Sequence, residues 1–271
     1  MQSEKQYIDL YTEAQQLIKE HAAPVLNEVR DKAFEDFRRQ GFPTKKVERY
    51  KYTDMQKLFE PDYGLNLNRL EIPVNPYDTF KCDVPNLSTS LYFIVNDQFY
   101  SKSLPKAKLN DGVIVDSLNH VATEHPELVA KYYGRLANTE ADAITALNTM
   151  LAQDGLFIYV PKNVQLERTI QVINILRSDV DLMVNRRVLI VLEEGAKAQF
   201  LFCDHAADDR NFLATQVIEA YVGANANLEL NCLEETHAKN VRVSNVYIEQ
   251  QRDSRASHNV ITLHNGVTRN M

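Results

Sequence analysis

From Gly155 onward the chain reads as a series of short β-strands with almost no helical pattern between them. Eight runs rich in Val, Ile, Leu and Phe carry this pattern: residues 156–160, 168–176, 187–192, 198–203, 216–222, 226–233, 241–250 and 257–264. Their alternation of inward and outward positions predicts strands. Because no helices separate them, a doubly wound α/β sheet is excluded for this half of the chain.

A repeat runs through these strands. The turn Glu-Gly-Ala-Lys-Ala at 194–198 matches Val-Gly-Ala-Asn-Ala at 222–226, 28 residues later, and more weakly residues 252–256, 30 residues after that. Residues 161–165 form an earlier, looser member. A period of this length with two or more strands per unit is typical of a β-solenoid, in which each coil buries its inward face against its neighbours. Regularly spaced short strands also suit a β-sandwich or barrel, so that alternative stays open.

The start of the chain has a helical pattern instead. Over residues 3–40 apolar side chains recur at helical spacing, and Ser3 with Gln6 forms a capping-box pattern. Pro24 suits the first turn of a second helix, which Gly41 ends. We therefore expect two helices before residue 41.

The middle of the chain links the two patterns. Residues 60–113 are rich in proline, with short β-like runs such as 91–95, and residues 113–151 return to a helical pattern. The predicted organisation is α+β, with a mainly helical domain over 1–154 that includes this irregular segment. An incomplete β-helical core follows over 155–271.

Composition excludes several classes of function. The chain carries 30 Lys and Arg against 37 Asp and Glu, a net charge of −7, and it has no long basic block, so nucleic acid is not an expected partner. No glycine-rich phosphate loop or serine nucleophile elbow is present. No run reaches the length of a membrane span and the first residues are polar, while three cysteines are too few for a disulfide framework. We expect a cytoplasmic protein with no membrane partner.

Several segments resemble one family. Residues 43–54, Pro-Thr-Lys-Lys-Val-Glu-Arg-Tyr-Lys-Tyr-Thr-Asp, resemble a proline and Glu-x-Trp-Lys-Tyr-Thr segment near the start of the SufD members of the SufB/SufD family. This family forms the scaffold of SUF iron–sulfur cluster assembly. Residues 155–166 look like the strand that opens its β-helical core, the two Gly-Ala turns look like its corners, and residues 264–270 are similar to its later Gly-x-x-x-Arg-Asn turn. The likeness covers nearly the whole chain in order, although Tyr50 stands where the family has tryptophan.

The resemblance implies a fold and a set of partners. The fold is a right-handed parallel β-helix behind a helical domain, in a non-enzymatic scaffold subunit that pairs with a SufB-like subunit and a SufC-like ATPase. The iron–sulfur cluster is assembled by the complex, and no cofactor is expected to be bound by this chain itself. Family members continue past Met271, so the resemblance implies a chain truncated at its C-terminus. We expect its open end to make it aggregation-prone or homodimeric.

No catalytic, cofactor-binding or metal residue is carried over from the family, because its junction residues correspond to positions beyond Met271. The residues themselves offer one ligand-like pair, Cys203 and His205, which strand alternation places on the outer face. Two ligands are half of a metal or cluster site. The alternative, which we favour, is an outer-face thiol beside a surface histidine.

The remaining candidates are more simply explained as structural residues. Cys232 falls on the inward row and is expected to act as a small buried hydrophobe, while Cys82 has no neighbouring ligand. The repeat does not align the histidines at 237, 258 and 264 with Cys203, and those at 120 and 125 are expected at helix surfaces or ends. The acid pairs 193–194, 208–209 and 234–235 suggest an alternative function, a carbohydrate-binding or carbohydrate-active solenoid. Adjacent acids on a strand point to opposite faces, however, so solvation at turns and rims is expected.

Overall fold

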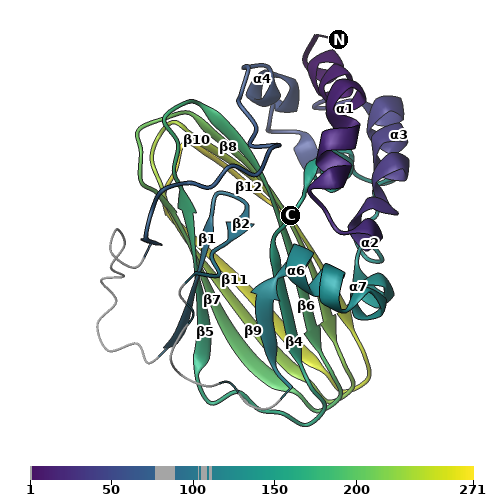
Figure 1. Ribbon diagram of the computed structural model, residues 1–271, viewed down its shortest axis with the longest axis vertical. Coiled ribbons are helices and arrows are strands. Elements are labelled where there is room, and N and C mark those ends of the chain that lie inside the picture. The colour runs from purple at the N-terminus through teal and green to yellow at the C-terminus, as the bar shows by residue number, and fades with distance from the viewer. Residues whose placement is uncertain (1, 77–88, 103, 105–108, 110–111) are drawn as a thin grey trace.

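The computed structural model describes residues 2–76, 89–102, 104, 109 and 112–271. A group of helices lies along one side of a long stack of strands, as Figure 1 shows. The second half of the chain is a parallel β-solenoid of about four turns, as predicted. Cys82 lies outside the described residues.

Two sheets of six strands form the solenoid. The strands are β1 (Thr89–Val95), β2 (Gln98–Phe99), β3 (Ile114–Ser117), β4 (Leu156–Val160), β5 (Thr169–Leu176), β6 (Leu182–Leu192), β7 (Lys197–Ala206), β8 (Phe212–Val222), β9 (Asn227–Glu235), β10 (Asn240–Gln250), β11 (Arg255–His264) and β12 (Val267–Asn270). One sheet has the order β12-β10-β8-β6-β4-β3, and we name it the helix-covered sheet. The other has the order β11-β9-β7-β5-β1-β2, and we name it the open sheet. β1 and β3, from the part of the chain before Gly155, pair with β5 and β4.

Each coil turns from the helix-covered sheet into the open sheet through a residue with positive φ. These corner residues are Asn163, Gly195, Asn225 and Asp253, with φ of 60°, 70°, 58° and 59°. Asn, Asp and Gly are the residues that tolerate this conformation. Strand pairing confirms that they are equivalent, because Lys197 lies opposite Asn227, which lies opposite Arg255.

The predicted register of the repeat was therefore wrong by two residues. It set Gly223 level with Gly195, whereas the residue level with Gly195 is Asn225. Phe200 consequently lies opposite Leu230, not Leu228. The error left the inward and outward faces unchanged, because a shift of two positions preserves strand alternation.

Gly223 has a different reason to be glycine. A Cβ atom there would lie 2.8 Å from the backbone carbon of Glu193 in the preceding coil. Gly155 is tighter still, since its Cβ would lie 1.9 Å from the carbonyl oxygen of Arg187. These glycines permit close approach of successive coils at the ends of strands.

The interior between the two sheets is mostly apolar. Rows of aliphatic and aromatic side chains stack from coil to coil, such as Val172, Phe202 and Cys232 in the open sheet and Ile190, Ala220 and Ile248 in the helix-covered sheet. Burial of these rows supplies the main driving force for stacking the coils.

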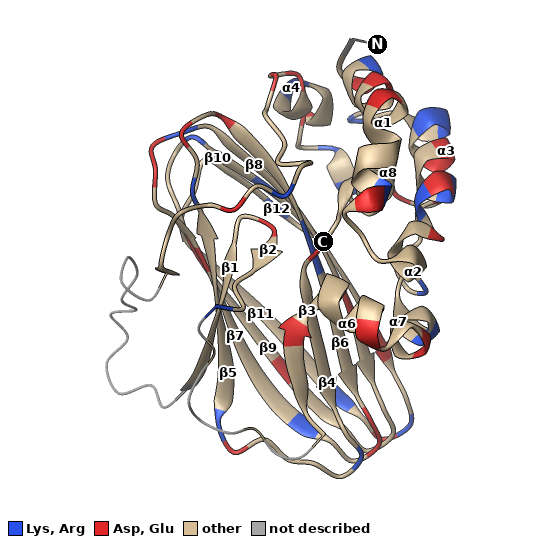
Figure 2. Ribbon diagram, viewed as in Figure 1, with Lys and Arg blue, Asp and Glu red and all other residues tan. Residues whose placement is uncertain are grey.

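The helices cover the outer face of the sheet that we named for them. They are α1 (Gln2–Glu20), α2 (Pro24–Asn27), α3 (Arg30–Gln40), the 3-10 helix η1 (Glu48–Tyr50), α4 (Met55–Phe59), α6 (Leu118–Glu124), α7 (Pro126–Tyr132) and α8 (Ala143–Leu151). Met183, Leu213 and Val243 of the sheet share a core cluster with α8, and Phe157 and Leu189 share one with α6 and α7. Charged residues gather on α1 and α3 and at the solenoid corners, as the ribbon colours of Figure 2 show.

The structure differs from the helical predictions in three places. α1 begins at Gln2, so Ser3 lies inside it and does not act as the cap. The helix predicted to begin at Pro24 is divided into α2 and α3 at Glu28 and Val29. Residues 114–117 form β3, because their backbone pairs antiparallel with that of β4. In the described part of the chain, no helix is both long and apolar enough to cross a membrane.

Candidate functional site

Cys203 and His205 lie on β7, on the side of the open sheet that faces away from the solenoid interior. Cys203 is fully buried there, in a cluster with Phe93, Ile173 and Ile175. Burial lowers the pKa of His205 and so favours its neutral form. The described residues contain no group of three or more His, Cys, Asp or Glu that could hold a metal ion. Among these residues, no further ligand of these types joins the pair.

Cys232 lies on the inward row of β9, as predicted. Its thiol contacts the ring of His258, with 3.8 Å between Sγ and Nε2. Burial raises the pKa of the thiol to about 12, and burial together with nearby Arg242 lowers the pKa of His258. Both groups are therefore neutral at pH 7, and a thiol with this pKa is a weak nucleophile.

A layer of buried polar side chains crosses the solenoid interior beside Cys232. Arg186 pairs with Asp204, and Arg242 pairs with both Asp204 and Glu234. Asn270 of β12 also contacts Arg242. Asn174, Asp204, Glu234 and Thr262 occupy one row across four coils of the open sheet. The guanidinium groups are desolvated but are held by carboxylates from neighbouring coils, which makes their burial tolerable.

Two other candidate histidines bond to backbone carbonyls, and one of the candidate acids is buried. His237 bonds the carbonyl of Asp208 at 2.8 Å and His264 that of Thr236 at 2.9 Å. The expected rim solvation is wrong for Glu234, which is fully buried on Arg242, whereas its neighbour Glu235 is exposed. Adjacent acids on this strand thus point to opposite faces, as predicted.

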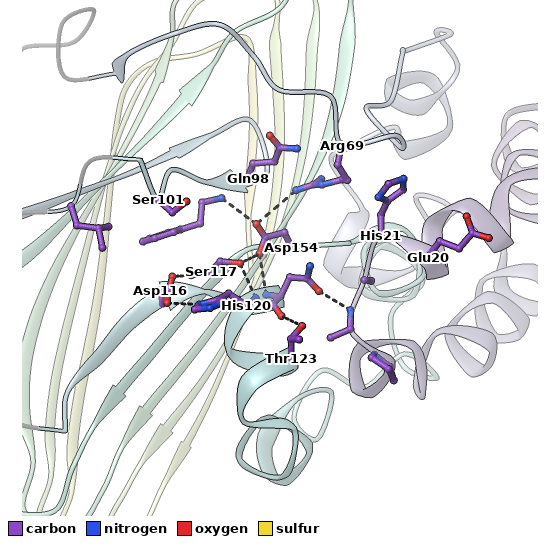
Figure 3. Close-up of a pocket in the computed structure, with 16 residues that line it drawn as sticks. Glu20, His21, Arg69, Gln98, Ser101, Asp116, Ser117, His120, Thr123 and Asp154 are labelled. Atoms are coloured by element: carbon purple, nitrogen blue, oxygen red, sulfur yellow. Dashed lines mark hydrogen bonds and ion pairs between the residues drawn. The ribbon is translucent and has the colours of Figure 1, made fainter.

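A recess of about 840 Å³ lies between the helices and the solenoid (Figure 3). At its base is Asp154, whose carboxylate accepts hydrogen bonds from Ser117 Oγ at 2.7 Å and from the backbone N–H groups of Asn119 and Phe99 at 3.1 and 3.2 Å. Arg69 approaches the same carboxylate at 3.8 Å. Burial raises the pKa of Asp154. Asp154 therefore bonds to both α6 and β2 and lies close to the loop that contains Arg69.

A histidine and a carboxylate lie at the rim of this recess. His120 Nδ1 bonds Asp116 Oδ2 at 2.7 Å, and this bond raises the pKa of His120. The imidazole is largely exposed, with 61% of its side-chain surface accessible. Ser117 Oγ at the same recess is already engaged, because it donates to Asp154 and accepts from the backbone N–H of His120.

Both halves of the chain match family models. The SufBD protein N-terminal region matches residues 1–172, and the SUF system FeS cluster assembly SufBD core domain matches residues 174–271. The chain belongs to the SufBD family. This finding favours the interpretation as a SufBD protein over the alternative of a carbohydrate-binding or carbohydrate-active solenoid.

Curated SufBD relatives are similar to parts of this chain. The chloroplastic SufBD family protein ABCI8 of Arabidopsis thaliana is 32% identical over 51% of this chain and 24% of its own length. ABCI9 of the same plant is 27% identical over 63% of this chain and 35% of its own length. The iron–sulfur cluster assembly protein SufD of Bacillus subtilis is 32% identical over 44% of this chain and 27% of its own length. The matched part of this SufBD chain therefore spans about a quarter to a third of these three relatives.

Sequence reasoning missed the polar layer and the contact between Cys232 and His258. With the register corrected, His258 lies opposite Leu230, next to Cys232 in the adjoining strand. The corner residues Asn163, Asn225 and Asp253 could have revealed this contact, because they mark the true register. They are not identical, but all three tolerate positive φ. The hydrogen bonds of Asp154 could not be predicted from local pattern, because their donors come from distant segments.

Proposed function

We propose that this SufBD chain acts as a non-enzymatic scaffold subunit in iron–sulfur cluster assembly, paired with a SufB-like subunit and a SufC-like ATPase. One observation carries the proposal: the N-terminal and core family models match in order and together span nearly the whole chain. The cluster is the cargo of the assembled complex and not a resident cofactor of this chain. We place this activity in the cytoplasm.

The chemistry of the thiols supports a role without turnover. Cys203 and Cys232 are both buried, and Cys232 has a raised pKa, so neither presents a reactive thiolate to solvent at neutral pH. The pairing surfaces of such a subunit, and not a nucleophile, would then carry its function. Without its partners, we expect the chain to associate with itself.

Co-expression tests the proposed pairing. The complete open reading frame that encodes this chain is expressed with SufB and SufC, and the mixture is resolved by size-exclusion chromatography. We expect a single complex that contains all three chains. Elution of the complete protein by itself, apart from both SufB and SufC, would contradict the proposal.

Anaerobic reconstitution tests the scaffold role separately. The chain alone, incubated with iron and sulfide, is expected to gain no cluster absorbance. Absorbance that appears in the native chain and disappears in a Cys203→Ala variant would show that the chain holds a cluster itself and would overturn this part of the proposal.

A further inference from the structure

The segment Pro43–Asp54 carries much of the family resemblance, yet only part of it is used by the fold. Tyr50 is buried, and its hydroxyl donates to Asp142 Oδ2 at 2.6 Å. Asp142 also accepts from Asn245 of β10 at 2.9 Å. Tyr50 therefore anchors the segment firmly to the helix-covered sheet.

The neighbours of Tyr50 face solvent. Tyr52 is 89% exposed, the highest value among the large apolar side chains that the structure describes as exposed. Lys46, Arg49 and Lys51 of the same segment are also exposed, and the ammonium group of Lys51 lies 5.6 Å from the centre of the Tyr52 ring. These side chains contribute little to the folded core.

Arg269 of β12 joins this surface from the far end of the sequence. Its guanidinium lies 5.8 Å from the centre of the Tyr50 ring and donates a hydrogen bond to the carbonyl of Arg49. The N-terminal segment and the last described strand thus present cations side by side. Because Tyr50 and the β12 backbone hold them, these cations are positioned before any partner arrives.

This surface is basic on an acidic protein. Lys51 is 3.9 Å from Glu48, a long separation for an ion pair, and the nearest carboxylate to Arg49 is Asp142, also at 3.9 Å and already bonded to Tyr50. Within the described part of the chain, no ion pair is formed by Lys46 or Arg269. Positive charge is therefore in excess on this surface, although the whole chain carries a net charge of −7.

We propose that Lys46, Arg49, Lys51, Tyr52 and Arg269, which we name the basic platform, bind an acidic segment of a partner protein. Exposed Tyr and Arg side chains are the residue types that concentrate binding energy in protein interfaces. A carboxylate-rich segment with one apolar side chain matches both features of the platform. A long polyanion fits it poorly, because the rest of the chain would repel it.

Fluorescence anisotropy tests the proposal on the chain itself. The probe is a labelled short peptide in which Asp and Glu surround one Phe, and its counterpart has Asn and Gln instead of the acids. We expect the acidic peptide to bind and the neutral one to bind much more weakly. Raising the salt from about 0.05 to 0.5 M should weaken binding, since exposed charges are screened.

Substitutions locate the binding surface. The triple variant Lys46→Gln, Arg49→Gln, Lys51→Gln should weaken binding about ten-fold, as expected for the loss of three exposed ion pairs. Tyr52→Ala should weaken it about five-fold. The matched control Lys162→Gln, Lys239→Gln, Arg252→Gln removes the same charge from exposed solenoid corners and should leave binding unchanged. Unchanged circular dichroism would show that all variants fold.

Three results would overturn the proposal. The first is equal weakening by the corner control, which indicates non-specific attraction, and the second is equal binding of the neutral peptide. In the third, a single-stranded oligonucleotide or phosphatidylserine vesicles displace the labelled peptide from the platform at a lower concentration than the unlabelled acidic peptide does. None of these results bears on pairing with SufB or SufC, because the experiment contains only this chain and the peptide.

Discussion

The two sheets of the solenoid share their interior but differ on their outer faces. In the helix-covered sheet every residue of β6 is buried, because one face meets the interior and the other meets the helices. In the open sheet, β9 alternates between buried and partly exposed positions, and β11 is exposed along most of its length. Strand alternation is therefore visible in the sequence only where one face is solvated.

Charged residues have different surroundings on the outer faces of the two sheets. Arg187 and Glu219 on the helix-covered sheet form an ion pair at 2.6 Å, with both side chains fully buried. Glu219 also accepts from the backbone N–H groups of Gly134, Leu136 and Ala137. Glu235 on the open sheet is exposed. A charge beneath the helices thus holds the two parts of the molecule together, whereas one on the open sheet is solvated.

Glu219→Gln should produce the largest effect. It leaves the buried guanidinium of Arg187 without its counter-charge, so we expect a loss of about 3–5 kcal/mol in the free energy of unfolding. Urea denaturation followed by circular dichroism measures this loss. The matched variant Glu235→Gln should change stability by less than about 0.5 kcal/mol. Equal losses in the two variants would contradict the difference between the outer faces of the two sheets.

Gly223→Ala should come next. The added Cβ meets the backbone of Glu193 and Glu194, and backbone displacement of this kind costs about 1–3 kcal/mol. Asn225→Gly, at the neighbouring corner with φ of 58°, should be nearly neutral, since glycine adopts this conformation freely. Thermal denaturation of the two variants compares them directly. If Gly223→Ala left the stability unchanged, the coils would separate more easily than their packing indicates.

Ile261 and Leu263 test the exposed end of the open sheet. Their side chains are 57% and 61% exposed on β11, whose outer edge has no paired strand among the described residues. Exposed edge strands promote association, and charges on them oppose it. We expect Ile261→Lys with Leu263→Lys to lower the mass measured by light scattering, with little change in stability. A native chain that is already monomeric would contradict the expected self-association.

A small pH effect should arise at the recess between α6 and β2. The folded pKa of His120 is raised by Asp116, so its stabilising contribution is complete below the ordinary pKa of histidine and is lost as pH rises through the folded value. Because the side chain is largely exposed, the loss should be a few tenths of a kcal/mol. Denaturation of the native chain and of His120→Gln between about pH 5 and pH 8 measures it. The part of the change in unfolding free energy with pH that is due to His120 should be absent in the variant.

Prediction of the strands from sequence succeeded where the apolar run is not interrupted. The predicted run 156–160 coincides with β4, whereas the runs at 187–192 and 216–222 begin too late. β6 starts at Leu182 and β8 at Phe212, because Asn185 and Arg186 interrupt the apolar pattern of β6 and Thr215 interrupts that of β8. These polar side chains are buried within and beneath the sheet, where strand propensity alone would not place them.

The site was less predictable than the fold. The sequence placed Cys203 outward and Cys232 inward correctly, but it gave no indication that Cys203 would be covered by Phe93 and Ile173. Asp154 acquired its hydrogen bonds from segments up to 55 positions away. Contacts of this kind depend on how distant segments are brought together, and local periodicity does not record them.

By itself, the sequence determined that the second half of this SufBD chain is a series of repeated strands, which side of each strand faces inward, and which residues can turn a corner. These properties depend on local alternation and on the tolerance of Asn, Asp and Gly for positive φ. Only the tertiary structure decided the register between coils. A shift of two residues preserves every apolar face, so the choice was left to the corners, to the close approach at Gly223, and to the pairing of Arg186 and Arg242 with Asp204 and Glu234.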